Sequence, residues 1–141
     1  MHDTGDDGRI ATMPITHINP PGIPGHPAYS QGTIAEAGRT LYIGGQNGVG
    51  PDGAITGDIA EQTRTALRNL IAVLEAAGGE KTDVVKMTIM IVESADLMAA
   101  FGASREVWGD VPTAVSMLRV AGLGRPEALI EIEAIAALPP A

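Results

Sequence analysis

The 141-residue chain contains no cysteine, and aromatic residues make up only 3% of it. The absence of cysteine excludes disulfides, thiolate metal ligands and a thiol nucleophile. The small aromatic content argues against a surface on which the bases of a single-stranded nucleic acid would stack. Hydrophobic residues nevertheless make up 45% of the chain, so we expect a globular core built from aliphatic side chains and methionine.

Positive charge is also scarce, with 9 Lys and Arg against 17 Asp and Glu and a net charge of -8. An acidic surface repels phosphate backbones and anionic lipids, which predicts no nucleic-acid partner and no membrane partner. No apolar run reaches the roughly 18 residues of a membrane span, and the acidic N-terminal stretch lacks the apolar segment of a secretory signal. We expect a cytoplasmic protein in which residues 1–13 form a disordered tail and residues 14–141 a single domain.

Sequence signatures of metal, nucleotide and hydrolase sites are missing as well. The histidines His2, His17 and His26 form neither an HxH nor an HExxH arrangement. The glycine-rich stretch 44–53 lacks the lysine of a phosphate-binding loop, and no G-x-S-x-G elbow is present. The sequence therefore predicts no metal and no cofactor.

Hydrophobic periodicity predicts an α+β fold. The clearest element is a helix over residues 58–77, with Asp58 as N-cap and Gly78-Gly79 as its end. Further expected elements are an ordered loop over 14–30, a hairpin of strands 31–36 and 40–45 that turns at Gly38, a strand at 83–92, a helix at 95–108 capped by Ser94, and strands at 113–123 and 129–136. The resulting order, β-β-α-β-α-β-β, predicts a single mixed sheet with both helices on one face.

The second face of that sheet is expected to be apolar too. In the 83–92 strand, Val85, Met87, Ile89 and Ile91 occupy one set of alternate positions, while Val84, Met90 and Val92 share the other with Lys86 and Thr88. A soluble monomer rarely leaves so large an apolar patch in water. The pattern therefore predicts a homo-oligomer that buries this face.

Two carboxylates, Glu131 and Glu133, interrupt the otherwise apolar stretch "LIEIEAIAAL" near the C-terminus. One interpretation is structural: Arg119 of the preceding strand would form an ion pair with one of them if the two strands are neighbours. The other is functional, because a carboxylate beside a subunit interface that admits water can orient that water for attack. The residues alone leave both interpretations open.

Several stretches in the same order and spacing, "PAYSQG", "LYIGGQNGVGPDG", "VAGL" and "LIEIEAIA", make residues 15–136 similar to the Rid (YjgF) family of reactive-intermediate deaminases. The resemblance implies a fold like that of bacillus-type chorismate mutase and a homotrimer with clefts between neighbouring subunits. It also implies hydrolysis of enamines and imines such as 2-aminoacrylate.

The resemblance also assigns roles to individual residues. Glu131 matches the catalytic glutamate that positions the attacking water, whereas Glu133 matches a more structural position. Tyr29 matches the tyrosine of the first stretch. Gly44 stands where a serine or threonine is often found in the second stretch.

Val115 marks a departure from the family pattern. It stands where active members carry an arginine that clamps the substrate carboxylate, and valine cannot form such charged hydrogen bonds. Val115, Ser116 and Met117 are expected to line the substrate site together with Tyr29 and Gly44. The departure predicts a substrate that does not depend on a carboxylate clamp.

Three functional hypotheses follow. The first is an imine or enamine hydrolase, in which Arg105, Arg119 or Arg125 could replace the missing arginine. The second is a non-catalytic binder of small molecules or a regulatory protein on the same scaffold. The third is an endoribonuclease or translation inhibitor, which the net charge of -8 and the lack of a His or Lys cluster oppose.

Overall fold

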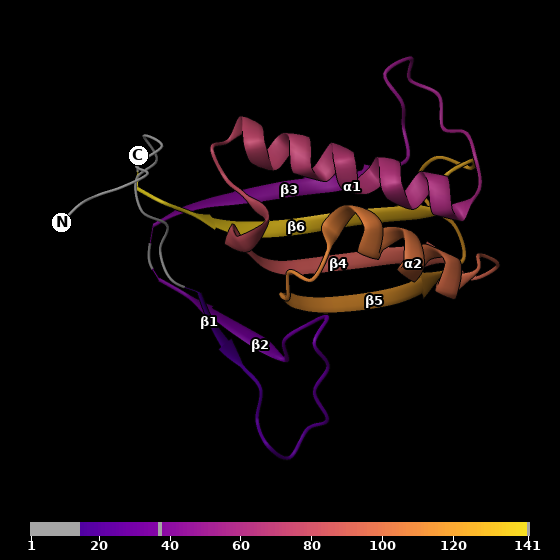
Figure 1. The fold of residues 1–141 in the computed structure, drawn as a ribbon. Helices are drawn as coiled ribbons and strands as arrows, with labels where there is room; N and C mark the ends of the chain where they lie inside the picture. The colour runs from indigo at the N-terminus through magenta and orange to yellow at the C-terminus, as the bar shows by residue number, and fades with distance from the viewer. Residues whose placement is uncertain (1–14, 37, 141) are drawn as a thin grey trace.

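The computed structural model describes residues 15–36 and 38–140, so the predicted tail at 1–13 lies outside the described residues. Two helices lie side by side on one face of a four-stranded sheet (Figure 1). The elements in chain order are β1 (Ile15–Ile18), β2 (Gly32–Ala35), β3 (Arg39–Asn47), α1 (Ile59–Ala76), the short 3-10 helix η1 (Lys81–Asp83), β4 (Val84–Val92), α2 (Leu97–Trp108), β5 (Ala114–Val120) and β6 (Ile130–Leu138). The predicted α+β class, with both helices on one face, is confirmed.

The main sheet has the strand order β3-β6-β4-β5. β6 runs antiparallel to both β3 and β4, whereas β4 and β5 are parallel and are joined through α2. The sheet is therefore mixed, as predicted. β3 and β5 form its two edges, and β6, which carries the two glutamates, lies inside it.

The predicted hairpin between residues 31–36 and 40–45 is wrong. β2 pairs instead with β1, from Ile15 opposite Ala35 to Ile18 opposite Gly32, and the two form a separate two-stranded sheet. The proline-rich segment was expected to be a loop throughout. Ile15–Ile18 precede the cluster of prolines, so their N–H groups are free to form a ladder, and the prolines occupy the connection that follows.

Both helices begin at an aspartate. The Asp58 side chain accepts a hydrogen bond from the Glu61 N–H at 2.9 Å, and this predicted N-cap of α1 is confirmed. The cap of α2 is Asp96 and not Ser94, because Asp96 accepts from the N–H groups of Met98 and Ala99 at 3.0 and 3.2 Å. α2 therefore starts at Leu97, two residues later than predicted.

The hydrophobic core fills the space between the helices and the sheet. Leu67, Leu70 and Leu74 of α1 are almost fully buried against alternate residues of β6, such as Ile130 and Ile132. In β4, a register shift between Val84 and Lys86 places Val84 in this core together with Met87 and Ile91. The strict alternation that was expected for this strand put Val84 on the other face, and the bulge is the reason that it does not lie there.

The opposite face of the main sheet, which we call the open face, is covered by neither helix. It carries Tyr42 of β3, with 74% of its surface exposed, and Leu118 of β5, with 47% exposed. Apolar residues of this size on an uncovered sheet agree with the predicted self-association, which stays a prediction. Neither helix of the described chain is long and apolar enough to cross a membrane.

Candidate active site

A groove of about 660 Å³ lies under α2, between this helix and the helix-covered side of β4 and β5. Because β5 is an edge strand, the groove opens at the edge of the sheet. Its apolar wall includes Met98 and Phe101 of α2 and Val115 and Met117 of β5. Met98, Phe101 and Met117 remain 72%, 42% and 47% exposed, respectively, so large apolar surfaces face the groove without a partner among the described residues.

The segment 26–31 forms one wall of the groove. The Ser30 N–H donates to the Thr113 carbonyl at 2.8 Å, and the Ser30 hydroxyl lies 2.6 Å from Nδ1 of His17. The ring of Tyr29 stacks on that of His26, with their centroids 5.4 Å apart. These contacts tie the segment to the start of β5 and hold Tyr29 at the groove.

Arg105 is the one arginine of the three considered as replacements that lines the groove. Its guanidinium forms an ion pair with Asp110 and lies 5.9 Å from the centre of the Phe101 ring. Arg119 instead donates to the Glu93 carbonyl. Arg125 bonds the Gly53 carbonyl and Glu127, so both of these arginines are engaged away from the groove.

Glu131 points to the open face of the sheet. It lies in β6 between Asn47 of β3 and Met90 of β4, and its side chain is half-buried. Its neighbours in the strand, Ile130 and Ile132, are buried on the helix side. Within residues 15–36 and 38–140, the Glu131 carboxylate accepts no hydrogen bond and forms no ion pair, which leaves it available to a water or ligand.

Gly45 makes room for that carboxylate. A Cβ built on Gly45 would overlap the carboxyl group of Glu131, whereas one built on Gly44 would meet nothing within 4 Å. Both glycines lie at the register shift between Ile43 and Gln46, where β3 bulges against β6. Gly44 was predicted for the site, whereas Gly45 was not. The adjacent glycines were the available signal, but the sequence could not say which of them faces the glutamate.

The ion-pair interpretation with Arg119 is wrong. Arg119 lies on β5, and β4 separates that strand from β6. Glu133 is exposed and lies opposite Thr88 on the open face, where Lys86 donates to the Ser116 hydroxyl at 2.7 Å. Glu133 therefore belongs to a polar strip on this face rather than to a pair with Arg119.

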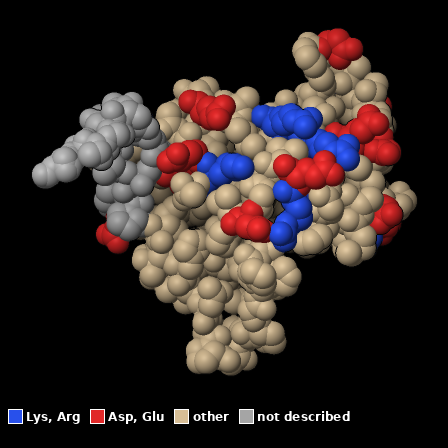
Figure 2. Space-filling view, in the orientation of Figure 1, with Lys and Arg blue, Asp and Glu red and all other residues tan. Residues whose placement is uncertain are grey.

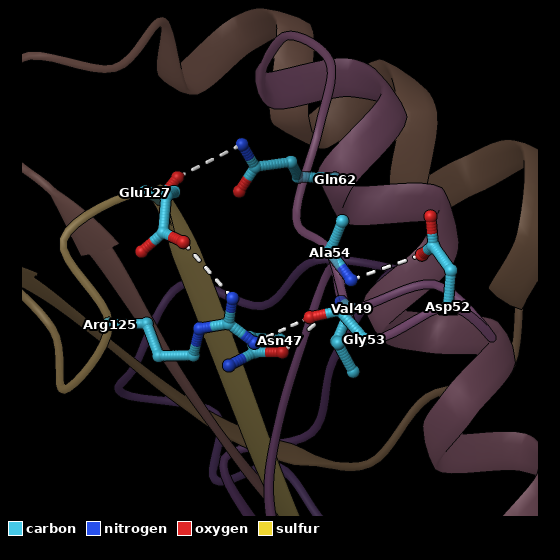
Figure 3. A network of polar contacts seen from close by, with 8 residues as sticks. All are labelled: Asn47, Val49, Asp52, Gly53, Ala54, Gln62, Arg125 and Glu127. Carbon is cyan, nitrogen blue, oxygen red and sulfur yellow. Dashed lines mark hydrogen bonds and ion pairs between the residues drawn. The ribbon is translucent and has the colours of Figure 1, made fainter.

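A network of polar contacts fixes the chain just before Glu131 (Figure 3). Gln62 of α1, only 3% exposed, donates to the carbonyls of Gly57 and Glu127 and accepts from the Leu129 N–H at 2.9 Å. Two residues after Leu129, the strand presents Glu131. This buried glutamine thereby holds the start of β6 against α1, a function that its sequence position did not reveal.

Arg125 extends the same network to the loop that follows β3. It donates to the Gly53 carbonyl at 3.0 Å and to the Glu127 carboxylate at 3.0 Å. The pKa of Glu127 is lowered by a hydrogen bond from its own backbone N–H and, next, by Arg125. The loop and the start of β6 are thus held together at the end of the sheet where Glu131 lies opposite Asn47, the last residue of β3.

The structure separates the six residues predicted for the site into two groups. Tyr29, Val115 and Met117 line the groove. Glu131 and Ser116 face the open side, and Gly44 lies at the exposed bulge of β3. Within one copy, the groove and the carboxylate therefore lie on opposite faces of the sheet. No group of three or more His, Cys, Asp or Glu that could hold a metal occurs among the described residues.

Fold and site together define a small α+β protein with two helices on a mixed sheet, an apolar groove at the sheet edge and a half-buried carboxylate on the open face. Residues 23–138 match the family model described as Endoribonuclease L-PSP. The chain belongs to this family, which is also known as the Rid or YjgF family.

Named relatives agree with this assignment. The 2-iminobutanoate/2-iminopropanoate deaminase of Rattus norvegicus is 38% identical over a match that covers 77% of this chain and 79% of the rat protein. The crystal structure of YyfB from Yersinia pestis, a Rid family protein, matches with a TM-score of 0.78 and 35% identity, covering 88% of this chain and 98% of YyfB. The structure of Escherichia coli TdcF with bound serine has a TM-score of 0.64 and 33% identity, covering 79% and 88% of the two chains.

Proposed function

We propose that this protein hydrolyses the C=N bond of small imines, including those formed from enamines, and that two copies of the chain complete each site. The observation that carries the proposal is the Glu131 carboxylate, which lies over Gly45 on the open face of the sheet. Relatives that are 38% and 34% identical to this chain are named imine deaminases, which supports this chemistry for the family.

Glu131 has the chemistry that the reaction requires. A carboxylate that accepts a hydrogen bond from a water can orient it and take its proton as the oxygen attacks the imine carbon. The resulting carbinolamine loses ammonia, so that one imine and one water give one carbonyl compound and one ammonia. Glu131 passes the proton that it took from water to the nitrogen, which gives the neutral carbinolamine. As the C–N bond breaks, Glu131 takes the hydroxyl proton and delivers it to the leaving nitrogen, so that ammonia departs and the carboxylate returns to its starting state. The step needs no oxidant and no metal.

The second copy follows from the placement of the residues. Glu131 lies on the open face and Val115 on the helix-covered side of the same sheet, so one copy cannot bring them to one substrate. A ring of three copies would bury the open faces, with their Met90 and Leu118, and set the Glu131 of one copy at the groove of the next. This assembly gives the exposed apolar residues of the open face a partner.

The substrate of this site differs from those in the names of the relatives. Iminobutanoate and iminopropanoate carry a carboxylate, and the groove wall here presents Val115 where the family resemblance places an arginine. Valine offers no hydrogen bond and no charge to an anion. We therefore propose that the reaction does not require a substrate carboxylate.

The direct test is hydrolysis of freshly generated imines, with and without a carboxylate, by the wild-type protein and by Glu131→Gln. We expect turnover that falls roughly 100- to 10,000-fold in this variant, the usual loss when a general base is removed. Glu133→Gln is the matched control, because it removes a carboxylate from the same face and should retain most activity. Turnover by neither protein above the uncatalysed rate would exclude the hydrolase and leave the non-catalytic binder.

Charge disfavours the endoribonuclease alternative. Figure 2 shows Lys and Arg interspersed with Asp and Glu over the helices, rather than gathered in a basic stripe. The net charge of -8 would also repel an RNA backbone. If the wild type cleaved RNA, Glu131→Gln abolished this cleavage and no imine were hydrolysed, the endoribonuclease would replace the imine hydrolase as the favoured function.

A further inference from the structure

We infer that the groove under α2 selects an uncharged substrate with a bulky apolar substituent, such as an aryl or branched alkyl group, and that Met98 and Phe101 are its specificity-determining residues. The inference rests on the proposed function, since it names the class of imine that the same site would take. Beyond that function, the inference states that the substrate's largest group binds in the groove and that α2 recognises it.

The exposed surface of the groove is the first argument. Met98 and Phe101 lie three residues apart on α2, which places them on the same face of the helix, and both line the groove together with Met117 of β5. Both are exposed large apolar side chains, Met98 at 72% and Phe101 at 42%. An apolar ligand would take this surface out of water and would gain its binding energy from that burial.

The charge in the groove is the second argument. The guanidinium of Arg105 is already neutralised by Asp110 and lies over the Phe101 ring. A substrate carboxylate would have to share this arginine with the negative charge of Asp110, which weakens the attraction. A neutral ligand leaves the pair intact, and the acidic net charge of the protein opposes anions in general.

The size of the groove is the third argument. Its volume of about 660 Å³ lies well inside the range of about 300 to 1,000 Å³ that is usual for sites of drug-sized ligands. An imine of three or four carbons would fill a small part of this space and would contact few of the apolar side chains. A ring or a branched chain would reach from β5 to α2.

Binding can be measured apart from catalysis with four ketones, which are the products of hydrolysis. Acetophenone and benzoylformate share a phenyl group and differ by a methyl in place of a carboxylate, and acetone and pyruvate form the same pair without the ring. Titration calorimetry with Glu131→Gln gives their affinities in a protein that does not turn over. We expect acetophenone to bind at least about tenfold more tightly than each of the other three.

Phe101→Ser and Met98→Ser test the assigned residues. Both side chains are exposed on the helix surface, so their loss should leave the fold intact and weaken acetophenone binding by roughly tenfold. The control is Ile23→Ser, which removes an apolar side chain that is 48% exposed but does not line the groove. It should leave the affinity unchanged.

The outcomes separate the inference from the function on which it rests. Tight binding of benzoylformate that Arg105→Gln abolishes would overturn the inference and make Arg105 a carboxylate clamp. Hydrolysis of imines without preference for the phenyl group, or insensitivity of binding to Phe101→Ser, would also overturn it while the hydrolase stands. Selective binding of acetophenone with no turnover of any imine would support the groove assignment and refute the hydrolase.

Discussion

The two faces of the main sheet differ although the same strands build both. On the helix-covered side, residues such as Ile130 and Ile132 pack into the core, and the groove opens where the cover ends at β5. On the open face, Glu131 lies next to Met90 and Glu133 lies opposite Thr88, and neither helix covers them. The comparison teaches that strand alternation puts the groove and Glu131 on opposite faces, which is the reason for proposing that a second copy completes the site.

The largest expected effect is a loss of folding stability when the core under the helices is truncated, compared with a truncation on the open face. Leu70→Ala removes a fully buried side chain of α1 and should lower the free energy of unfolding by about 2 to 5 kcal/mol. Leu118→Ala truncates a half-exposed leucine on the open face and should mainly weaken self-association. Chemical denaturation and sedimentation of both variants check this. A loss of stability in Leu118→Ala as large as in Leu70→Ala, without any change in association, would contradict the distinction.

A smaller effect concerns the two adjacent glycines. Gly45→Ala should force the Glu131 carboxylate out of position and lower imine hydrolysis by up to about 100-fold, the loss that a displacement of about 1 Å can cause. Gly44→Ala is the matched control, since its new methyl group enters open space. Steady-state kinetics on both variants, with circular dichroism to verify folding, make the comparison. Equal activities would show that Gly45 does not position Glu131.

A substitution in the groove wall is expected to change the substrate specificity. Val115→Arg should raise the ratio of turnover for carboxylate-bearing over neutral imines by about tenfold or more, because arginine gives an anion charged hydrogen bonds. Ala114→Arg, one residue earlier and on the alternate face of β5, should not produce this change. Competition between the two imines in one assay measures the ratio directly. The same shift in both variants would indicate a general effect of charge.

The smallest expected effect is the pH dependence of an ion pair between the helices. The Arg64 guanidinium donates to Glu106 at 2.8 Å and lowers the pKa of this carboxyl. A lowered folded-state pKa gives stability that is present above the ordinary value of about 4.3 and is lost as the pH falls through the folded-state pKa.

Denaturation of the wild type and of Glu106→Gln tests this contribution across the acid range. We expect a small difference at neutral pH that vanishes below about pH 4 and shrinks with added salt, since the pair is exposed. A difference that stays constant across the acid range would mean that Glu106 acts through packing and not through charge.

Much of the fold could be predicted because it follows from local signals. The i, i+3, i+4 pattern around Leu67 and Leu70 and the cap at Asp58 marked α1, and the apolar alternation of residues 83–92 and 129–136 marked two strands. The pairing of β2 with β1 could not be predicted, because the short β2 strand has the same local pattern whether it pairs with β1 or with β3. Ser94 and Asp96 are both good capping residues, and only the geometry after β4 chose between them.

The site was harder to predict because it depends on contacts between distant segments. Glu131 was singled out as a carboxylate in an apolar stretch and Val115 by the family resemblance, but their placement on opposite faces required the strand order. Gly45 and Gln62 were missed, since their importance comes from what they contact: the Glu131 carboxylate and the start of β6. The sequence around Gly45 or Gln62 contains no pattern that would predict these contacts.

The most direct test of the central claim is complementation between two inactive variants. Glu131→Gln lacks the carboxylate, and Met117→Trp is designed to fill the groove. If each site takes Glu131 from one copy and the groove from the next, mixed rings formed by co-refolding should regain about one quarter of the wild-type sites. Imine hydrolysis of the mixture, measured against each variant alone, gives the answer. Recovery near that fraction would establish the composite site, and no recovery in rings shown to be mixed would contradict it.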